Sequence, residues 1–437
     1  MEQDIVDVVV VGAGPAGIAA AMVLARAGKE VVVLERGDYP GCKNMFGGAI
    51  YTQPTAELFP EFWKDAPVER FNTEHRFAFL TNDSAVTMGY KSDVHAKEPH
   101  YNSFTVKRPK WDRWCAQKAE EAGAFIVPQT LVVELLREDG KIVGVKTEQE
   151  DFRARVTIVA EGCNSLLAKK AGLHPELNPE DVAVGIKEVI KLPKEKIEDR
   201  FNCENGSGVI YTIIGGPMEN MMGMGYIYTN QDSVVVGLGV SLGDLKEKKL
   251  KPYDLLEDLK KHPAIRPLIE GGELEEYSGH LIPEGGYRSV PKLYTDGLML
   301  VGDSAMLVNN VHWEGTNLAM ASGRMAAETA LEALEKNDFS ANTLSLYKKK
   351  LDESYVMKDL KSYKDVAHFA EKNSHIMMGF YPRKMNEFMD TFVGVDSVPK
   401  AKKFKSFISN TIKERSIPAM ISDFVKFARI GGGVIIR

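Results

Sequence analysis

Residues 5–35 read IVDVVVVGAGPAGIAAAMVLARAGKEVVVLE, and this stretch decides the fold. Its first seven residues are apolar except for one aspartate, which is typical of a buried parallel strand. The glycine-rich segment of residues 12–17 then leads into an alanine-rich helix, and residues 30–35 are typical of the next strand. The pattern predicts a βαβ unit that binds a dinucleotide.

Each glycine of this turn has a separate expected role. Gly12 allows the tight turn, Gly14 lets a pyrophosphate approach the backbone, and Gly17 brings the helix against the strand. The helix N-terminus then faces the negative charge. Glu35 ends the second strand, where its carboxylate can accept hydrogen bonds from ribose hydroxyls. A flexible glycine loop is the alternative, and the strand, helix and carboxylate that surround the turn disfavour it.

Composition excludes several classes of protein. The chain has 437 residues, of which 44% are hydrophobic and 27% charged, so we expect a globular protein of two or three domains. A net charge of -6 gives no basic footprint for nucleic acid. The four cysteines form no C-x-x-C pair, which argues against a disulfide framework, a metal site or an internal iron–sulfur cluster. Residues 8–25 are apolar and reach the ~18-residue length of a membrane span, but their glycines and proline predict a turn instead.

Three further blocks resemble the FAD-dependent oxidoreductases of the glutathione-reductase and hydroxybenzoate-hydroxylase type. Residues 297–305 (GLMLVGDSA) predict a buried strand that ends in Gly302-Asp303, and in this family that pair holds the ribityl chain of the flavin. Residues 108–114 (RPKWDRW) are similar to the family's R-x-x-x-D-x-W segment. Residues 159–165 (VAEGCNS) are similar to its second pyrophosphate motif, with Glu161 in place of the usual Asp. The resemblance implies non-covalent FAD in an α/β, Rossmann-like fold.

Three more segments narrow this resemblance: residues 40–48 (PGCKNMFGG), 281–287 (LIPEGGY) and 314–319 (EGTNLA). They are similar to electron-transfer-flavoprotein:quinone oxidoreductases of the short FixC type, which lack the fused iron–sulfur domain. The likeness runs over roughly residues 1–380. It implies an enzyme that passes electrons from electron-transfer flavoprotein to menaquinone or ubiquinone, with a separate small ferredoxin-like iron–sulfur subunit and a place in an electron-bifurcating complex. Met306 replaces the last glycine of the family's Gly-Asp-Ala-Ala-Gly.

Motifs and resemblance together predict the residues that contact FAD, while the chemistry itself belongs to the cofactor. The backbone N–H groups of a helix that begins at Gly315 are expected to face the flavin and stabilise its charge on reduction. Lys43 adds a positive charge, with a solvated lysine as the alternative. Trp313 and Glu314 are the quinone-site candidates because they precede that helix, with a core tryptophan as the alternative. The predicted FAD contacts are Gly12, Gly14, Pro15, Ala16, Gly17, Glu35, Arg36, Lys43, Asn44, Gly47, Gly48, Arg108, Val132, Ala160, Glu161, Gly162, Gly302, Asp303, Gly315, Thr316 and Asn317.

The positions of these motifs predict a discontinuous FAD-binding domain with a second domain inserted into it. Strand-like runs at residues 208–214 and 233–240 predict that the inserted quinone or substrate domain is rich in antiparallel sheet. Helical patterns cover residues 252–269 and the C-terminal region. The expected boundaries are 1–75, 105–180 and 285–335 for the FAD-binding domain, 76–104 and 181–284 for the quinone domain, and 336–437 for a helical region that contacts a partner or membrane.

The C-terminal residues 375–437 are basic, with eleven Lys or Arg and five Asp or Glu. Their apolar residues recur at near-helical spacing. A basic amphipathic helix can lie on an anionic membrane, although such a face also packs on its own domain. The resemblance favours the membrane because a quinone is dissolved in lipid. We therefore expect a cytoplasmic protein that is peripheral on the inner face of the cell membrane.

Two other functions stay open at this stage. One is an FAD-dependent reductase of isoprenoid (geranylgeranyl) double bonds, and the other is a docking subunit that flavin stabilises without turnover. Met218, Met221, Met222 and Met224 fit either a pocket for an isoprenoid tail or an irregular core. Cys42 fits a small residue in a flavin-covering loop better than a redox partner.

Overall fold

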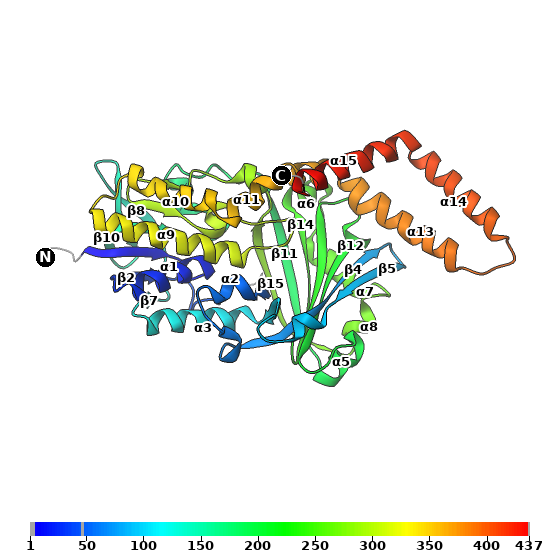
Figure 1. Ribbon diagram of the computed structural model, residues 1–437, viewed down its shortest axis with the longest axis horizontal. Helices are drawn as coiled ribbons and strands as arrows, with labels where there is room; N and C mark the ends of the chain where they lie inside the picture. Colours follow the sequence, from blue (N-terminus) through cyan, green and yellow to red (C-terminus); the bar gives the residue numbers. More distant parts are fainter. Residues whose placement is uncertain (1–4, 45–47, 436–437) are drawn as a thin grey trace. The chain divides into compact units, whose positions relative to one another are not determined.

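The computed structural model describes residues 5–44 and 48–435 of the chain (Figure 1). The chain divides into two compact units. Unit 1 contains residues 1–71, 97–183 and 279–361, and unit 2 contains residues 72–96, 184–278 and 362–437. The C-terminal region that we predicted as one part from residue 336 is thus divided between the units near residue 361. The assignment of FAD and quinone to separate domains stays a prediction.

A mainly parallel sheet forms the centre of unit 1, with antiparallel strands at its edges. Its strands follow the order β16-β17-β10-β1-β2-β7. Strand β1 (Ile5–Val11) pairs in parallel with β10 (Asp151–Val159) on one side and with β2 (Val31–Leu34) on the other. Every residue of β2 and of β17 (Leu298–Leu300) is buried, as expected of a parallel sheet that is covered on both faces. The sheet is completed by β7 (Phe125–Val127) and β16 (Tyr294–Thr295), and β8 (Val132–Glu138) and β9 (Lys141–Thr147) extend it from β10.

Three helices of unit 1 hold the predicted motifs. Helix α1 (Pro15–Arg26) follows the glycine-rich turn and packs against α9 (Thr316–Lys336) and α3 (Arg108–Glu121). The approach of α1 to α9 is close, because a Cβ added at Gly323 would lie 2.0 Å from the Ala16 carbonyl oxygen. The helix predicted to begin at Gly315 is confirmed, with Gly315 as the N-cap of α9. Helix α10 (Ala341–Glu353) also packs on α9, and α11 (Tyr355–Ser362) follows it.

Unit 1 also contains shorter strands and helices that lie after residue 48 in the sequence. Strand β3 (Ala49–Tyr51) pairs with β6 (Ser103–Val106), which also pairs with the first residues of β4 (Val68–Leu80). Helix α2 (Thr52–Ala56) follows β3 directly, and both pack against α9. Helix α4 (Leu166–Lys170) follows β10. These connections place the ends of β3, β10 and β17 in the same unit as the glycine-rich turn.

Unit 2 is built on an antiparallel sheet, as the alternating strand patterns predicted. The hairpin of β12 (Ser207–Gly215) and β13 (Gly223–Thr229) continues into β14 (Ser233–Ser241). The later part of β4 pairs with β5 (Ala85–Lys91), and β11 (Val182–Lys191) and β15 (Glu273–Pro283) are the other long strands of the sheet. Met218 and Met221 are buried in the core of this unit, so they serve as core residues.

The helical pattern predicted over residues 252–269 is two helices, α7 (Pro252–Lys261) and α8 (Arg266–Ile269). The break falls at His262, which has extended backbone angles (φ -56°, ψ 135°) and precedes Pro263. The ring of a proline disfavours helical angles in the residue before it, which explains the break. Unit 2 also contains α5 (Lys194–Phe201) and α6 (Leu242–Lys248).

Helices alone form the C-terminal part of unit 2, drawn in orange and red in Figure 1. Helix α12 (Val366–Lys372) and a π-helical turn (His375–Phe380) lead into α13 (Tyr381–Val393), α14 (Lys400–Glu414) and α15 (Ile417–Ile435). Helices α13 and α14 pack against each other. Within the described residues, no helix combines the length and the apolar character needed to cross a membrane.

Candidate functional site

The glycine-rich turn between β1 and α1 is shaped by close backbone contacts. Gly12 has a φ of +100°, and a Cβ there would lie 2.4 Å from the Ala160 carbonyl oxygen. A Cβ at Gly17 would lie 1.9 Å from the Gly12 carbonyl oxygen. At Gly14 the nearest atom is the Asn44 side-chain nitrogen, at 3.7 Å. The protein therefore fills the space beside Gly12 and Gly17 and leaves Gly14 open. The tight turn at Gly12 and the close helix at Gly17 are as predicted, and the approach of a pyrophosphate to Gly14 stays a prediction.

The N-terminus of α1 keeps its hydrogen-bonding capacity. Its N-cap is Gly14, and no side chain caps the first turn. The N–H groups of that turn have no partner within the helix, and the helix dipole adds positive charge there. A phosphate accepts hydrogen bonds from such N–H groups and carries negative charge, so this turn fits the pyrophosphate of a dinucleotide.

Glu35 ties the turn to the end of the second strand. Its carboxylate accepts a hydrogen bond from the Ala13 backbone N–H (2.9 Å) and another from the Gly37 N–H (2.7 Å). The side chain is buried. These two bonds hold the turn after β1 against the turn after β2. The predicted contact of Glu35 with ribose hydroxyls stays a prediction, and it is compatible with the lone pairs that the carboxylate retains.

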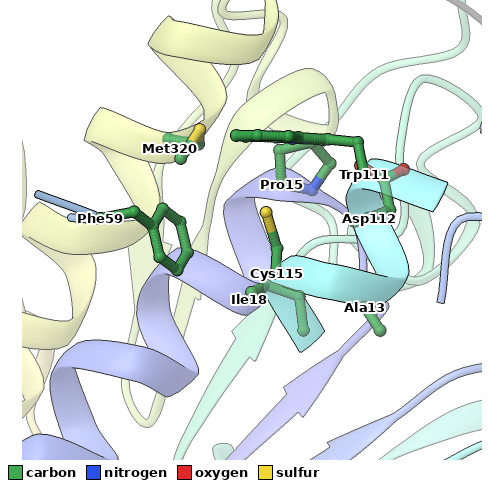
Figure 2. A pocket seen from close by; sticks show the side chains of 9 residues that line it. Ala13, Pro15, Ile18, Phe59, Trp111, Asp112, Cys115 and Met320 are labelled. Carbon is green, nitrogen blue, oxygen red and sulfur yellow. The ribbon is translucent and has the colours of Figure 1, made fainter. Parts of the chain in front are cut away.

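Figure 2 shows the side chains that gather beside Pro15 and Ile18 of α1: Trp111 and Cys115 of α3, Phe59, and Met320 of α9. They line a cavity of about 10 Å³. That volume holds about one water molecule. The cavity is therefore too small for a substrate, and its lining instead fixes α1, α3 and α9 around the turn.

A buried ion pair in α3 holds the loop that follows β2. The Arg108 guanidinium contacts the Asp112 carboxylate at 2.9 Å, one helical turn away, and both side chains are buried. The Asn44 side chain donates a hydrogen bond to the same carboxylate at 2.6 Å. A Cβ at Gly41 would lie 2.5 Å from the Asp112 Cβ, so the loop approaches α3 closely. Arg108 and Asn44 are thus brought together beside the glycine-rich turn.

The segment after β10 brings the predicted second pyrophosphate motif to the same edge of the sheet. Ala160 N–H donates to the Val11 carbonyl at 2.8 Å. The Glu161 carboxylate accepts hydrogen bonds from the backbone N–H groups of Leu167 (2.8 Å) and Ala168 (2.9 Å), at the start of α4. Burial raises the Glu161 pKa, and those bonds oppose the rise. In this structure Glu161 caps a short helix, and its contact with FAD stays a prediction.

Two carboxyl groups, Asp303 after β17 and Glu284 after β15, carry no compensating cation at hydrogen-bond distance among the residues described. Burial raises the pKa of Asp303 to about 6, against the nearby Arg108 charge. Burial also raises the pKa of Glu284 to about 7. Gly302, with a φ of +59°, donates its N–H to the Ser322 hydroxyl at 2.9 Å and so joins the strand end to α9. Hydroxyl donors of a ligand fit a carboxylate in the position of Asp303.

The N-terminus of α9 is the second uncapped helix end of the site. Gly315 is its N-cap, and no side chain caps the turn that begins at Thr316. The side-chain oxygen of Asn317 is buried and has no hydrogen-bond partner among the described residues. Trp313, just before, is 40% exposed and has a φ of +57°. A ligand with a polar edge fits this end of the helix.

The remaining predicted contacts lie outside the turn itself. Arg36 and Lys43 are exposed, and Val132 is buried in the core of unit 1. Gly48 accepts a hydrogen bond from the Val106 N–H at 2.8 Å, which starts the pairing of β3 with β6. Gly47 lies outside the described residues. The roles of these residues toward FAD stay predictions.

Two polar residues of the site were missed from the sequence. The Thr52 hydroxyl and the Asn309 side-chain nitrogen are buried and, within the described ranges, have no hydrogen-bond partner. Asn309 lies close to the Gly-Asp pair in the sequence, which is a hint that could have been used. Thr52 had none, because only the packing of β3 and α2 on α9 brings it into the site.

Comparison with protein families agrees with this arrangement. Residues 7–188 match the model for FAD dependent oxidoreductases. Residues 182–282 match the model described as ETF-QO, ubiquinone-binding, and residues 366–431 match the ETF-QO/FixC family C-terminal domain. The open Gly14, the two uncapped helix ends and the half-buried Asp303 fit FAD. FAD is therefore the cofactor of this chain.

Curated relatives match along almost the whole chain. Protein FixC of Bradyrhizobium diazoefficiens is 43% identical over 434 residues, which cover 98% of this chain and 99% of that protein. The probable electron transfer flavoprotein-quinone oxidoreductase YdiS of Escherichia coli is 41% identical, with the same coverage of the two chains.

Solved structures show the same fold at lower identity. A geranylgeranyl bacteriochlorophyll reductase-like protein from Thermoplasma acidophilum has a TM-score of 0.70 at 21% identity, covering 94% of this chain and 98% of its own. The myxobacterial FAD-dependent halogenase CndH has a TM-score of 0.67 at 16% identity, covering 95% of this chain and 91% of its own. These two likenesses concern the fold alone.

Proposed function

This chain belongs to the family of electron transfer flavoprotein–quinone oxidoreductases and FixC proteins, and we propose that it passes electrons from an electron transfer flavoprotein to a quinone. The observation that carries the proposal is the full-length match to YdiS, whose name states this activity. The match of residues 182–282 to a ubiquinone-binding model supports a quinone as the acceptor.

The residues of the site suit this function. When bound, FAD supplies a carrier that takes up and releases electrons singly or in pairs. The N-terminus of α1 binds its phosphates, and Asp303 accepts hydrogen bonds from its hydroxyls. The N-terminus of α9 stabilises negative charge beside it, which favours the acceptance of electrons.

Mixing experiments test the proposal directly. The purified chain, loaded with FAD, is mixed with reduced electron transfer flavoprotein and then with a water-soluble quinone analogue. The flavin absorbance should fall in the first step and return in the second. Return of colour with a polyprenyl lipid but not with quinone would contradict the proposal and favour an isoprenoid reductase. A flavin that neither partner alters would favour a docking subunit.

We also propose that the chain works with a separate ferredoxin-like iron–sulfur subunit, within an electron-bifurcating complex. The likeness to the short FixC-type proteins supports this partner. Isolation of the native complex tests it, because flavin and iron–sulfur absorption bands should then appear together with a small co-purifying subunit. A complex that contains flavin bands alone would contradict the proposal.

The C-terminal helices support a location at the membrane surface. The Phe388 ring packs against Phe404 and Phe407, so some of the apolar side chains join α13 to α14. Five other apolar side chains of α14 and α15 are exposed, and we call them the apolar face: Ile408, Ile412, Ile417, Ile421 and Phe424. Lys402, Lys405 and Lys413 lie on the same helix as the first two isoleucines and make no ion pair with any described residue. Exposed apolar groups beside free lysines suit the interface of an anionic membrane.

We therefore propose that the protein is peripheral on the cytoplasmic face of the cell membrane. The FAD-loaded chain should float with vesicles that contain phosphatidylglycerol and bind less to vesicles of phosphatidylcholine alone. Replacing both Ile408 and Ile412 by Ser should abolish flotation. Leu274→Ser is the matched control, because Leu274 is 60% exposed on β15 of the same unit. Flotation that the double substitution leaves unchanged would contradict the role of the apolar face.

A further inference from the structure

The segment before α9 forms a closed loop that fixes the position of Glu314. Asn309 and Glu314 form a β-bridge, in which each donates its backbone N–H to the carbonyl of the other, at 2.9 and 3.0 Å. The Asn309 side-chain oxygen also accepts a hydrogen bond from the Val311 N–H at 3.2 Å. The loop therefore holds Glu314 directly beside the first turn of α9.

Polar groups from two other parts of unit 1 surround the Glu314 carboxyl. Tyr51 at the end of β3 interacts with it electrostatically, as do Tyr355 and Asp359 of α11. The Tyr355 hydroxyl donates a hydrogen bond to the Asn317 carbonyl at 3.3 Å, which ties α11 to the start of α9. On its own segment, Glu314 faces His312 and the side chains of Asn309 and Asn317.

Three buried polar atoms in this same region lack a partner among the residues that the structure describes. They are the Thr52 hydroxyl, the Asn309 side-chain nitrogen and the Asn317 side-chain oxygen. Their residues are 4%, 1% and 4% exposed. Buried polar groups are nearly always hydrogen-bonded, so an amide donor, an amide acceptor and a hydroxyl that can do either point to a ligand with polar ring substituents.

The Glu314 carboxyl holds its proton more strongly than an ordinary carboxyl. Burial and the neighbouring Asp359 raise its pKa, while the Asn317 side chain and His312 oppose the rise. Burial together with the Glu314 charge raises the pKa of Tyr51 to about 12, and burial raises that of Tyr355 further. Both tyrosines therefore keep their protons, whereas the carboxyl of Glu314 can release one.

We propose that the Glu314 carboxyl donates a proton to the quinone during its reduction. This assignment rests on the proposed function. Reduction of the quinone to the quinol consumes two electrons, which come from the electron transfer flavoprotein, and two protons. One O–H bond breaks at Glu314 and one forms on a quinone oxygen, while the second proton comes from water. The carboxylate left behind is then reprotonated by water.

The test compares the FAD-loaded wild-type chain with Glu314→Gln and Glu314→Asp. In rapid mixing of the reduced enzyme with a water-soluble quinone, the wild-type rate should fall as the pH rises above the pKa of Glu314. Glu314→Gln should be slower by roughly 10²-fold, the contribution usual for a general acid, and its rate should lose that dependence on pH. Glu314→Asp should keep the dependence on pH at a lower rate. Glu353→Gln is the matched control, since Glu353 is exposed on α10 of the same unit.

A second measurement is independent of turnover. The infrared band of a protonated carboxyl should disappear as the pH of the wild-type protein is raised, and the Gln variant should lack this change. A Gln variant that keeps the wild-type pH profile and carboxyl band would overturn the assignment and leave electron transfer to quinone intact. Failure of the wild-type enzyme to reduce any quinone would overturn both.

Discussion

The glycine-rich turn of unit 1 and the C-terminal helices of unit 2 keep their shapes by different means. The turn depends on backbone contacts, such as the one that leaves 1.9 Å between a Cβ at Gly17 and the Gly12 oxygen. The helices depend on charged side chains. Glu414 at the end of α14 accepts hydrogen bonds from Arg383 (2.8 Å) and Lys384 (2.7 Å) of α13.

The ion pairs continue at the start of α15. Asp423 is 2% exposed and binds the Arg415 guanidinium, and it accepts a hydrogen bond from the Tyr381 hydroxyl at 3.0 Å. A larger side chain in the turn would clash with the backbone. The ion pairs accept a side chain of another shape provided that the charge is kept. The turn predicted to bind the cofactor is thus a rigid part of the chain, and the helices proposed to meet the membrane are held by contacts that respond to their electrostatic surroundings.

The largest effect is expected from Gly17→Val, which tests the steric side of this comparison. The new side chain meets a backbone oxygen that cannot move without shifting β1 or α1, so we expect a loss of about 3 kcal/mol or more in the free energy of unfolding. The FAD content should fall with it. Urea unfolding and the ratio of flavin to protein measure both. Gly28→Ala is the control, because Gly28 has a φ of +69° but no atom near a Cβ, and it should cost only about 1 kcal/mol.

An intermediate effect is expected from Asp423→Asn, which keeps the shape and removes the charge. Loss of the charged hydrogen bond to Arg415 should cost about 2 kcal/mol. Hydrogen exchange should speed up in the start of α15 and in α13, while the FAD content stays at the wild-type value. Equal loss of FAD from this variant would show that the two regions are not independent.

The same pair gives a pH dependence with a definite sign. The hydrogen bond from Arg415 lowers the pKa of Asp423 below its ordinary value. A carboxyl with a depressed pKa in the folded state stabilises that state above its unfolded pKa of about 3.9, and this stabilisation is lost as the pH falls further. Protection against hydrogen exchange in α15, relative to the intrinsic exchange rate at each pH, should therefore fall below about pH 4, and the Asn variant should lack this fall.

The smallest effect concerns Met306, where this chain departs from the glycine of the family pattern. Met306 has a φ of +56° and is buried. Replacement by Gly or by Ala removes the same packed side chain, but only Ala keeps the cost of the left-handed backbone. Met306→Gly should therefore be more stable than Met306→Ala by about 1 kcal/mol in thermal or urea unfolding. Equal stability would mean that the backbone relaxes at this position.

The sequence predicted the turn, α1 and Glu35 because their pattern is local and each residue type has a steric or hydrogen-bonding reason. It did not predict that Glu161 caps α4, since the start of that helix depends on an αL residue, Ser165. Thr52 was beyond reach for another reason, because its place in the site follows from the packing of α2 on α9. The basic, apolar character of the last helices was visible, but the pairing of Glu414 and Asp423 required the arrangement in space.

Glu35 has a consequence for how the holoprotein matures. Its carboxylate joins Ala13 and Gly37 within the chain itself, so the cradle takes its final form before any nucleotide arrives. Loading then needs no rearrangement of the strands, and FAD can enter late, after the chain has folded. A polypeptide made when flavin is scarce would keep an assembled receptor and become active as soon as the supply recovers.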